Sequence, residues 1–213
     1  VECGLAALPS DLAGTVVVTY GDVPLLSSDT LRDLLLVHDA GAAGVTVLTA
    51  YVPDPAGYGR IVRDADGSVL RIVEHKDATE AERTITEVNS GIYAFDGALL
   101  RDALASVGAS NAQGEKYLTD VVAIARERER GVAAYVLDDV WQTEGVNDKV
   151  QLARLGAELN RRTVEAAMRE GAIVRDPATT WIDTTVSIGR DTVIHPNTQL
   201  LGVGVDDRVA ADG

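Results

Sequence analysis

Apolar and polar residues along the first fifty positions alternate in blocks that predict strand, helix and strand. Residues 15–18 are all β-branched, a pattern typical of a buried central strand in a parallel sheet. Apolar residues at helical spacing follow the N-cap cluster 27–30, with His38 expected near the exposed end of this helix. Residues 45–50 form a second apolar run. This order predicts a parallel βαβ unit with a right-handed crossover.

The middle of the chain shows shorter periods and more turn residues. Two apolar runs flank an Asp66–Gly67 turn, which predicts a β-hairpin. A longer strand is predicted next, and Gly91 inside it marks either a bulge or a close approach to the backbone. The remaining patterns predict a helix at 98–107, a second helix after Thr119 and a strand at 132–137.

The last third changes character twice. Residues 148–170 have the pattern of one long helix that ends at Gly171. After it, apolar residues recur every sixth position, at Ile182, Ile188, Ile194 and Leu200. A six-residue period is the signature of a parallel β-helix, and the few repeats indicate only its start. We therefore expect three parts: an α/β domain over 1–147, a linker helix over 148–171 and the start of a β-helix over 172–213.

Composition excludes several classes of partner. The chain has 213 residues and a formal net charge of −14. This charge argues against non-specific nucleic-acid binding and against an anionic membrane surface, but not against an anionic substrate held with a cation. The chain has no apolar run of about eighteen residues, so we expect no membrane span. Cys3 is the single cysteine, which fits a reducing, cytoplasmic location.

Chemistry-bearing residues follow several of the predicted strands. Asp22 comes after the first strand, at the end where open α/β sheets gather ligands. It is either a metal or ligand position or the cap of a turn. Gly59, Glu74 and Asn89 each have two interpretations as well. One is a ligand-binding role, and the other is a turn glycine, a solvated charge and a bulge residue, respectively.

Six short motifs carry a resemblance to a known family. They occur in order at 20–25, 57–61, 72–78, 89–93, 111–120 and 144–148. Together they resemble the bifunctional N-acetylglucosamine-1-phosphate uridylyltransferase / glucosamine-1-phosphate N-acetyltransferase of bacteria. The resemblance covers nearly the whole chain. It implies an α/β fold: a Rossmann-like nucleotidyltransferase (nucleotide-diphospho-sugar transferase) sheet, a linking helix and the start of a left-handed parallel β-helix.

The resemblance also implies an activity. In this family UTP and N-acetylglucosamine-1-phosphate react to UDP-N-acetylglucosamine and pyrophosphate, which serves peptidoglycan synthesis. The full-length proteins carry an acetyltransferase activity as well and assemble as homotrimers. The in-line attack on the α-phosphorus needs positioning and charge neutralisation more than covalent work by the protein, so no catalytic side chain is predicted.

The family's site positions fall on residues of this chain. Two metal positions fall on Asp22 and Asp148, where the family commonly has Asn at the second, and the implied ion is Mg²⁺. Sugar positions fall on Gly59 through its backbone, on Glu74 as a hydroxyl acceptor and on Asn89 through its amide. Further substrate contacts are implied for Tyr20, Gly21 and Asp148, and the expected pocket-wall residues are Tyr58, Glu115, Tyr117 and Thr119.

The family's phosphate-binding loop, Leu-Ala-Ala-Gly-x-Gly-Thr-Arg-Met, is not found in the sequence. We therefore expect a fragment that begins after that loop, ends early in the β-helix and catalyses neither reaction alone. Two alternatives stay open. One is a non-catalytic sugar-phosphate-binding or oligomerisation fragment. The other is a different hexose-1-phosphate nucleotidyltransferase, which the sequence from Glu74 to Ala78 disfavours.

Overall fold

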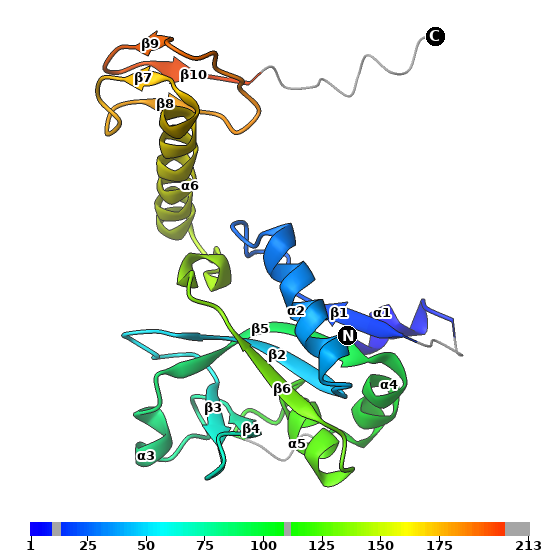
Figure 1. Ribbon diagram of the computed structural model, residues 1–213. Helices are drawn as coiled ribbons and strands as arrows, with labels where there is room; N and C mark the ends of the chain where they lie inside the picture. The colour runs from blue at the N-terminus through cyan, green and yellow to red at the C-terminus, as the bar shows by residue number, and fades with distance from the viewer. Residues whose placement is uncertain (10–13, 109–111, 203–213) are drawn as a thin grey trace. The chain divides into compact units, whose positions relative to one another are not determined.

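The computed structural model describes residues 1–9, 14–108 and 112–202 and divides the chain into two compact units (Figure 1). The units comprise Val1–Gly145 and Val146–Gly213. Asn111, which opens the fifth motif, and residues 203–213 of the predicted β-helix segment lie outside the described residues. Among the described helices, none is long and apolar enough to cross a membrane.

The first unit is built on a mixed sheet with β5 at its centre. The strands are β1 (Thr15–Val18), β2 (Val45–Tyr51), β3 (Arg60–Arg63), β4 (Val69–Val73), β5 (Glu87–Asp96) and β6 (Val132–Val136). The order is β4-β3-β5-β2-β6, with β1 also paired to β5. β1, β2 and β3 all run antiparallel to β5, whereas β2 and β6 are parallel.

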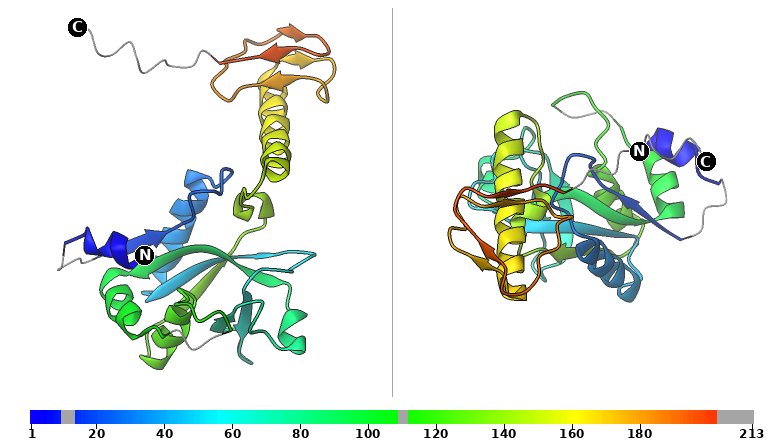
Figure 2. Two further views of the ribbon diagram at one scale, coloured as in Figure 1. Left: turned by 180° about the vertical axis from the view of Figure 1, so that it is seen from behind. Right: turned by 90° about the horizontal axis from the view of Figure 1, so that it is seen from above.

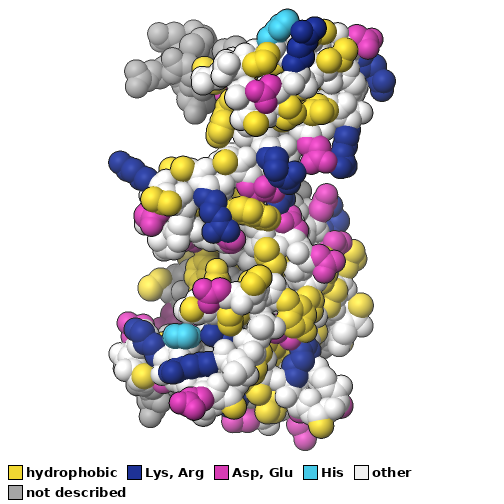
Figure 3. All heavy atoms as spheres, turned by 90° about the vertical axis from the view of Figure 1, so that its left-hand side faces the viewer, with side chains coloured by type: hydrophobic (Ala, Val, Ile, Leu, Met, Phe, Trp, Pro, Cys, Tyr) yellow, Lys and Arg dark blue, Asp and Glu magenta, His cyan; other side chains and the backbone are white. Residues whose placement is uncertain are grey.

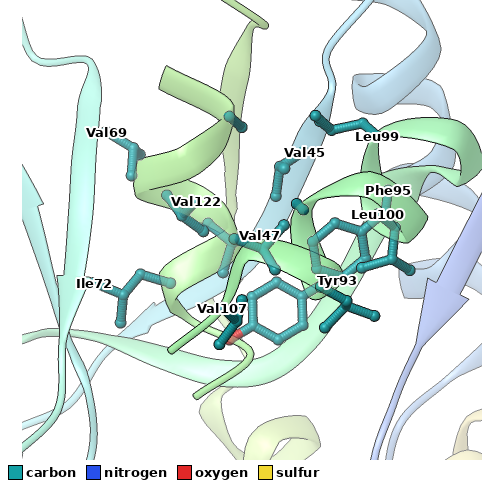
Figure 4. Close-up of a cluster of buried hydrophobic side chains, with 14 of the residues drawn as sticks. Val45, Val47, Val69, Ile72, Tyr93, Phe95, Leu99, Leu100, Val107 and Val122 are labelled. Atoms are coloured by element: carbon teal, nitrogen blue, oxygen red, sulfur yellow. The ribbon is translucent and has the colours of Figure 1, made fainter. Parts of the chain in front are cut away.

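Helices cover both faces of this sheet (Figure 1, Figure 2). The helices of the first unit are α1 (Glu2–Ala6), α2 (Ser28–Ala40), α3 (Glu80–Arg83), α4 (Gly97–Ser106), α5 (Asp120–Glu127) and the short 3-10 helix η1 (Val140–Thr143). On one face, α4 and α5 pack on the sheet through a cluster that includes Val47, Tyr93 and Leu100 (Figure 4). On the other face, Leu34 of α2 packs against Leu48. A sheet with helices on both faces agrees with the expected Rossmann-like class.

The first strand differs from its prediction. β1 is not a buried central strand of a parallel sheet, because in the described chain it pairs only with β5 and in the antiparallel sense. Its side chains alternate between exposed and half-buried, and Val17 is 38% exposed. β1 and β2 do point the same way, but β5 lies between them. A run of β-branched residues fits a half-exposed strand as well as a buried one. The burial of β1 therefore depends on which strands it pairs with.

Several local predictions are confirmed. Ser27 caps α2, and its hydroxyl accepts a hydrogen bond from the Thr30 amide. β3 and β4 form the predicted hairpin around Gly67, which has a φ of +86°. His38 is the exception: it is buried rather than exposed, and its Nδ1 lies 3.0 Å from Oγ1 of Thr46.

The second unit combines one long helix with stacked short strands. α6 (Lys149–Glu170) begins at its N-cap Asp148 and ends at Gly171, whose φ of +112° closes the helix. The strands are β7 (Ile173–Val174), β8 (Trp181–Ile182), β9 (Val193–Ile194) and β10 (Gln199–Leu200). β7 pairs with β9 and β8 with β10, both in parallel. Thus each of β7 and β8 lies beside a strand from further along the chain.

The six-residue period corresponds to the interior of this stack. Ile182 and Ile194 are buried together with Val174 and with Val164 of α6, and the partly buried Ile188 and Leu200 pack against them. Residues at every sixth position therefore point to one common core, as the sequence period predicts.

Charges on the surface are mixed. On the face shown in Figure 3, Lys and Arg side chains are interspersed with Asp and Glu rather than gathered in one basic patch. Several of the described basic residues also lie in ion pairs, such as Arg126 with Asp64 and Arg71 with Glu82.

Candidate functional site

Three of the predicted sugar-binding residues form one row across three strands. Arg60 of β3 is in register with Val73 of β4 and with Val88 of β5. Both pairings are antiparallel, so one step further along lie Gly59, Glu74 and Asn89, side by side. The backbone N–H of Asn89 donates a hydrogen bond of 2.9 Å to the backbone carbonyl of Gly59.

The missing side chain of Gly59 keeps this row open. A Cβ on Gly59 would lie 3.1 Å from Cγ2 of Ile72 and 3.5 Å from both Oε1 of Glu74 and Cβ of Asn89. A side chain at this position would therefore lie in contact with the Glu74 carboxylate. A glycine here therefore lets a ligand approach the backbone and the carboxylate together.

Glu74 is held in a defined and partly dry position. The Thr119 hydroxyl donates a hydrogen bond of 3.1 Å to Oε1 of Glu74. Thr119 occupies the N-cap position of α5 but makes no side-chain cap, so its hydroxyl serves Glu74 instead of the helix. Burial raises the pKa of Glu74, the Thr119 hydrogen bond opposes this, and Asp77 and Asp120 raise the pKa further.

A cavity of about 250 Å³ adjoins this carboxylate. Its walls come from β4, from the segment after it and from the start of α5: Arg71, Ile72, Val73, Glu74, Asp77, Tyr117, Thr119, Asp120 and Ala123. Asp77 and Asp120 had no assigned role in the sequence, whereas Tyr117 and Thr119 were expected as wall residues. The position of Asp120 directly after Thr119 was the available signal, but only the fold brings it to Glu74.

Asn89 is fixed by its own strand. Its Oδ1 accepts a hydrogen bond of 3.0 Å from the Gly91 amide, and its side chain also bonds to the buried Tyr93 hydroxyl. The register of β5 against β2 shifts here, which agrees with a bulge, one of the two alternatives that Gly91 indicated. Gly91 has a φ of +79°.

The segment after β1 lies beside the row. Tyr20 is 59% exposed, yet its ring packs directly on the Gly91 backbone. Partial burial, together with the charges of Glu74 and Asp22, raises the pKa of the Tyr20 hydroxyl. Gly21 is exposed, and a Cβ there would meet no atom within 4 Å. Tyr20 thus connects the end of β1 to β5 near Asn89 of the row.

Asp22, predicted as a metal position, has an exposed carboxylate. Within the described residues, no hydrogen bond or ion pair engages its carboxylate. A Cβ on Gly145 would lie 3.3 Å from Oδ2 of Asp22, so the glycine leaves the carboxylate accessible. No group of three His, Cys, Asp or Glu that could hold a metal occurs in the described chain. Mg²⁺ does not need one, because it binds through one or two carboxylates with water and phosphate oxygens.

The second predicted metal residue, Asp148, belongs to the second unit. It is the N-cap of α6, and its Oδ1 accepts a hydrogen bond of 2.7 Å from the Gln151 amide. The structure therefore assigns this carboxylate a local role in helix capping. Tyr20, Asp22, Gly59, Glu74 and Asn89 all belong to the first unit.

The sequence matches a protein family and several known proteins. Residues 6–184 match the family model described as nucleotidyl transferase. Proteins named "Bifunctional protein GlmU" match over 95% of the chain, with 61% identity in Pseudarthrobacter chlorophenolicus and 59% in Mycolicibacterium vanbaalenii. The one from Corynebacterium efficiens is 58% identical over 98% of the chain. The chain covers 42%, 41% and 43% of these proteins, respectively, or about two-fifths of their length.

A solved structure shows a similar fold. The crystal structure of a putative glucose-1-phosphate thymidylyltransferase from Bacillus anthracis, in complex with a sucrose, aligns with a TM-score of 0.50 and 22% identity. The alignment covers 68% of this chain and 54% of that one.

Proposed function

The chain belongs to the nucleotidyl transferase family, and we propose that it carries the sugar-phosphate half of an N-acetylglucosamine-1-phosphate uridylyltransferase site. The observation that carries the proposal is the row of Gly59, Glu74 and Asn89, with a Tyr20 hydroxyl on which the charges of both Glu74 and Asp22 act. Its support is the identity of about 60% to proteins named for GlmU over nearly the whole chain. The reaction joins UTP and N-acetylglucosamine-1-phosphate to give UDP-N-acetylglucosamine and pyrophosphate.

The row suits an N-acetylated sugar. Glu74 is an acceptor for a sugar hydroxyl, and the Thr119 hydrogen bond fixes its direction. Asn89 has its Oδ1 engaged by Gly91, and of its two side-chain N–H groups one bonds to Tyr93 and the other can donate to an acetamide carbonyl. Gly59 admits the sugar to its backbone. Neutral hydroxyl and acetamide groups are recognised by a few placed donors and acceptors rather than by charge, which matches this set.

The phosphate end needs positive charge that the row does not provide. Mg²⁺, when bound, neutralises charge on phosphate oxygens. In this proposal Asp22, in the first unit, would hold the ion. Tyr20 and Gly21 are further substrate contacts in this proposal, and the charges of both Glu74 and Asp22 act on the Tyr20 hydroxyl.

The finer features of the whole protein are part of the same proposal. They are a left-handed β-helix continuing from the parallel strand pairs of the second unit, an acetyltransferase activity there, homotrimer assembly and a cytoplasmic location. Their support is the six-residue period and the similarity to proteins named bifunctional. The 213 residues alone are proposed to bind the sugar phosphate without catalysing either reaction.

Calorimetric titration tests the proposed specificity. The chain is titrated with N-acetylglucosamine-1-phosphate and with glucose-1-phosphate, each with and without MgCl₂. We expect tighter binding of the N-acetylated compound, and weaker binding of it by Asn89→Ala and Glu74→Ala. Glu127→Ala, a substitution at the last position of α5 and outside the row, is the control and should bind as the unchanged chain does. Equal binding of the two sugars would favour a different hexose-1-phosphate nucleotidyltransferase.

An activity assay tests the proposed loss of catalysis. Pyrophosphate release from UTP and N-acetylglucosamine-1-phosphate is measured with the chain alone. We expect none. Turnover at the rate of a full-length uridylyltransferase would contradict the expectation that these residues hold only part of the site.

A further inference from the structure

Arg60 is a buried cation directly beside the sugar-facing row. It is 1% exposed and is the first residue of β3. Its Nη1 donates to the Tyr58 carbonyl, and its Nη2 lies 3.3 Å from Nδ1 of His75. A guanidinium has only donors, so Nδ1 of His75 is the acceptor in this contact. Nε of Arg60 is buried without a hydrogen-bond partner among the described residues.

The two contacts of Arg60 reach the two segments that carry the row. Tyr58 comes immediately before Gly59, and His75 comes immediately after Glu74. Side chains of successive strand residues point to opposite faces, so Arg60 does not share the face of its neighbour Gly59. Arg60 therefore lies on the opposite face of the sheet and connects the segments that carry Gly59 and Glu74.

The partners of Arg60 are unusual for a buried guanidinium. Arg63, in the same strand, forms an ion pair in which Nε and Nη2 donate to the two oxygens of Glu87, at 2.7 and 2.6 Å. Arg60 instead uses a backbone carbonyl and an imidazole, and no carboxylate of the described residues is hydrogen-bonded to it. Burial lowers its pKa, Arg83 lowers it further and Asp54 opposes this. A buried charge without a paired charge destabilises the folded state. The contacts of Arg60 are therefore better explained by the positions that they give Tyr58 and His75 than by a gain in folding stability.

We propose that Arg60 is a positioning residue for sugar selection: by holding Tyr58 and His75 it fixes the spacing between Gly59 and Glu74. This inference rests on the proposed function, because the spacing matters for a ligand that contacts both residues. A sugar phosphate that must reach the Gly59 backbone, the Glu74 carboxylate and the Asn89 amide at once is selected only if the row is rigid. Loosening one member weakens the preference for the N-acetylated sugar more than it weakens folding.

The test compares two ligands across a matched set of variants. Affinities for N-acetylglucosamine-1-phosphate and glucose-1-phosphate are measured by calorimetry for the unchanged chain, Arg60→Lys, His75→Ala, His75→Gln and Arg63→Lys. We expect the preference for the N-acetylated sugar to fall about tenfold in Arg60→Lys and His75→Ala, because small displacements of positioning groups have large effects. His75→Gln restores an acceptor and should keep the preference. Arg63→Lys weakens an ion pair in the same strand and should also keep it.

The outcomes separate this inference from the proposed function. An unchanged preference in both Arg60→Lys and His75→Ala overturns the inference while the proposed function stands. If the unchanged chain shows no preference, the proposed function fails. The positioning role of Arg60 is then tested by hydrogen exchange of the backbone amide of Asn89. That amide donates to Gly59, so it should exchange about tenfold faster in Arg60→Lys and His75→Ala than in Arg63→Lys. Equal exchange in the three variants overturns the positioning role.

Discussion

The Tyr20 ring rests on the backbone of Gly91 so closely that a Cβ on Gly91 would lie 1.8 Å from Cε2 of the ring. The contact joins the end of β1 to the bulge in β5. The same Gly91 donates its amide hydrogen to Asn89. Gly91 therefore both contacts the Tyr20 ring and holds the side chain of Asn89, a predicted sugar-binding residue.

Gly91→Ala should destabilise the chain in two ways. The φ of +79° strains any residue with a Cβ, and the Tyr20 ring occupies the space that the Cβ needs. Gly67→Ala is the matched control, because its φ is +86° and nothing lies within 4 Å of its Cβ position. We expect Gly91→Ala to lose at least about 1 kcal/mol more than Gly67→Ala in urea unfolding. Equal losses would mean that the ring moves aside without cost.

Glu74→Gln should separate stability from binding. Burial raises the pKa of Glu74, so the folded state disfavours the charged carboxylate at neutral pH. Gln keeps an oxygen that can accept from Thr119 and carries no charge. We therefore expect thermal unfolding at pH 7 to occur at a higher temperature in Glu74→Gln, while affinity for N-acetylglucosamine-1-phosphate falls. A lower unfolding temperature would show that the carboxylate stabilises the fold.

Ligand binding should depend on pH through the same carboxylate. The pKa of Glu74 lies above its ordinary value of 4.5, so Glu74 takes up a proton at a higher pH than most glutamates do. As pH falls through this raised pKa, the charged acceptor is lost and sugar-phosphate affinity should decline. Calorimetry from pH 7 down to the ordinary glutamate value of 4.5 measures the decline, after correction for phosphate protonation with the Glu74→Gln variant. Identical pH profiles for the two chains would remove Glu74 from the binding site.

Asp148 should tolerate Asn but not Ala. Asn caps helices as well as Asp does, so Asp148→Asn should leave α6 stable, whereas Asp148→Ala should cost about 1 kcal/mol. If Asp148 is the second metal ligand, Asp148→Asn should also keep activity within about tenfold in a complete uridylyltransferase, because an amide oxygen can still coordinate Mg²⁺. Urea unfolding and pyrophosphate release measure the two effects. Complete loss of activity in Asp148→Asn would show that the second negative charge is required.

Asp22→Asn gives the comparison for the predicted metal site. Asp22 caps no helix, and no hydrogen bond or ion pair within the described chain depends on its carboxylate. We expect unfolding to be unchanged and the Mg²⁺ dependence of ligand binding to be lost. A loss of stability with unchanged Mg²⁺ dependence would return Asp22 to the role of a turn residue.

Local signals in the sequence determined the elements of this protein. Asp148 and Gly171 mark the ends of α6, because a side-chain cap and a left-handed glycine act within one turn of helix. Gly67 marks the hairpin turn between β3 and β4 for the same local reason. The six-residue spacing from Ile182 onward indicated which residues face the core of the second unit. In each case the interacting atoms are close in sequence or repeat at a fixed interval.

Tertiary structure alone decided which elements meet. The exposure of β1, the burial of His38 against Thr46 and the row of Gly59, Glu74 and Asn89 all depend on pairing between distant segments. The sequence offered Glu74 as a solvated charge or a ligand, and the register of β3 with β4 and β5 placed it beside Gly59. Strand register and sheet order arise from contacts summed over the whole core, so no short stretch of sequence encodes them.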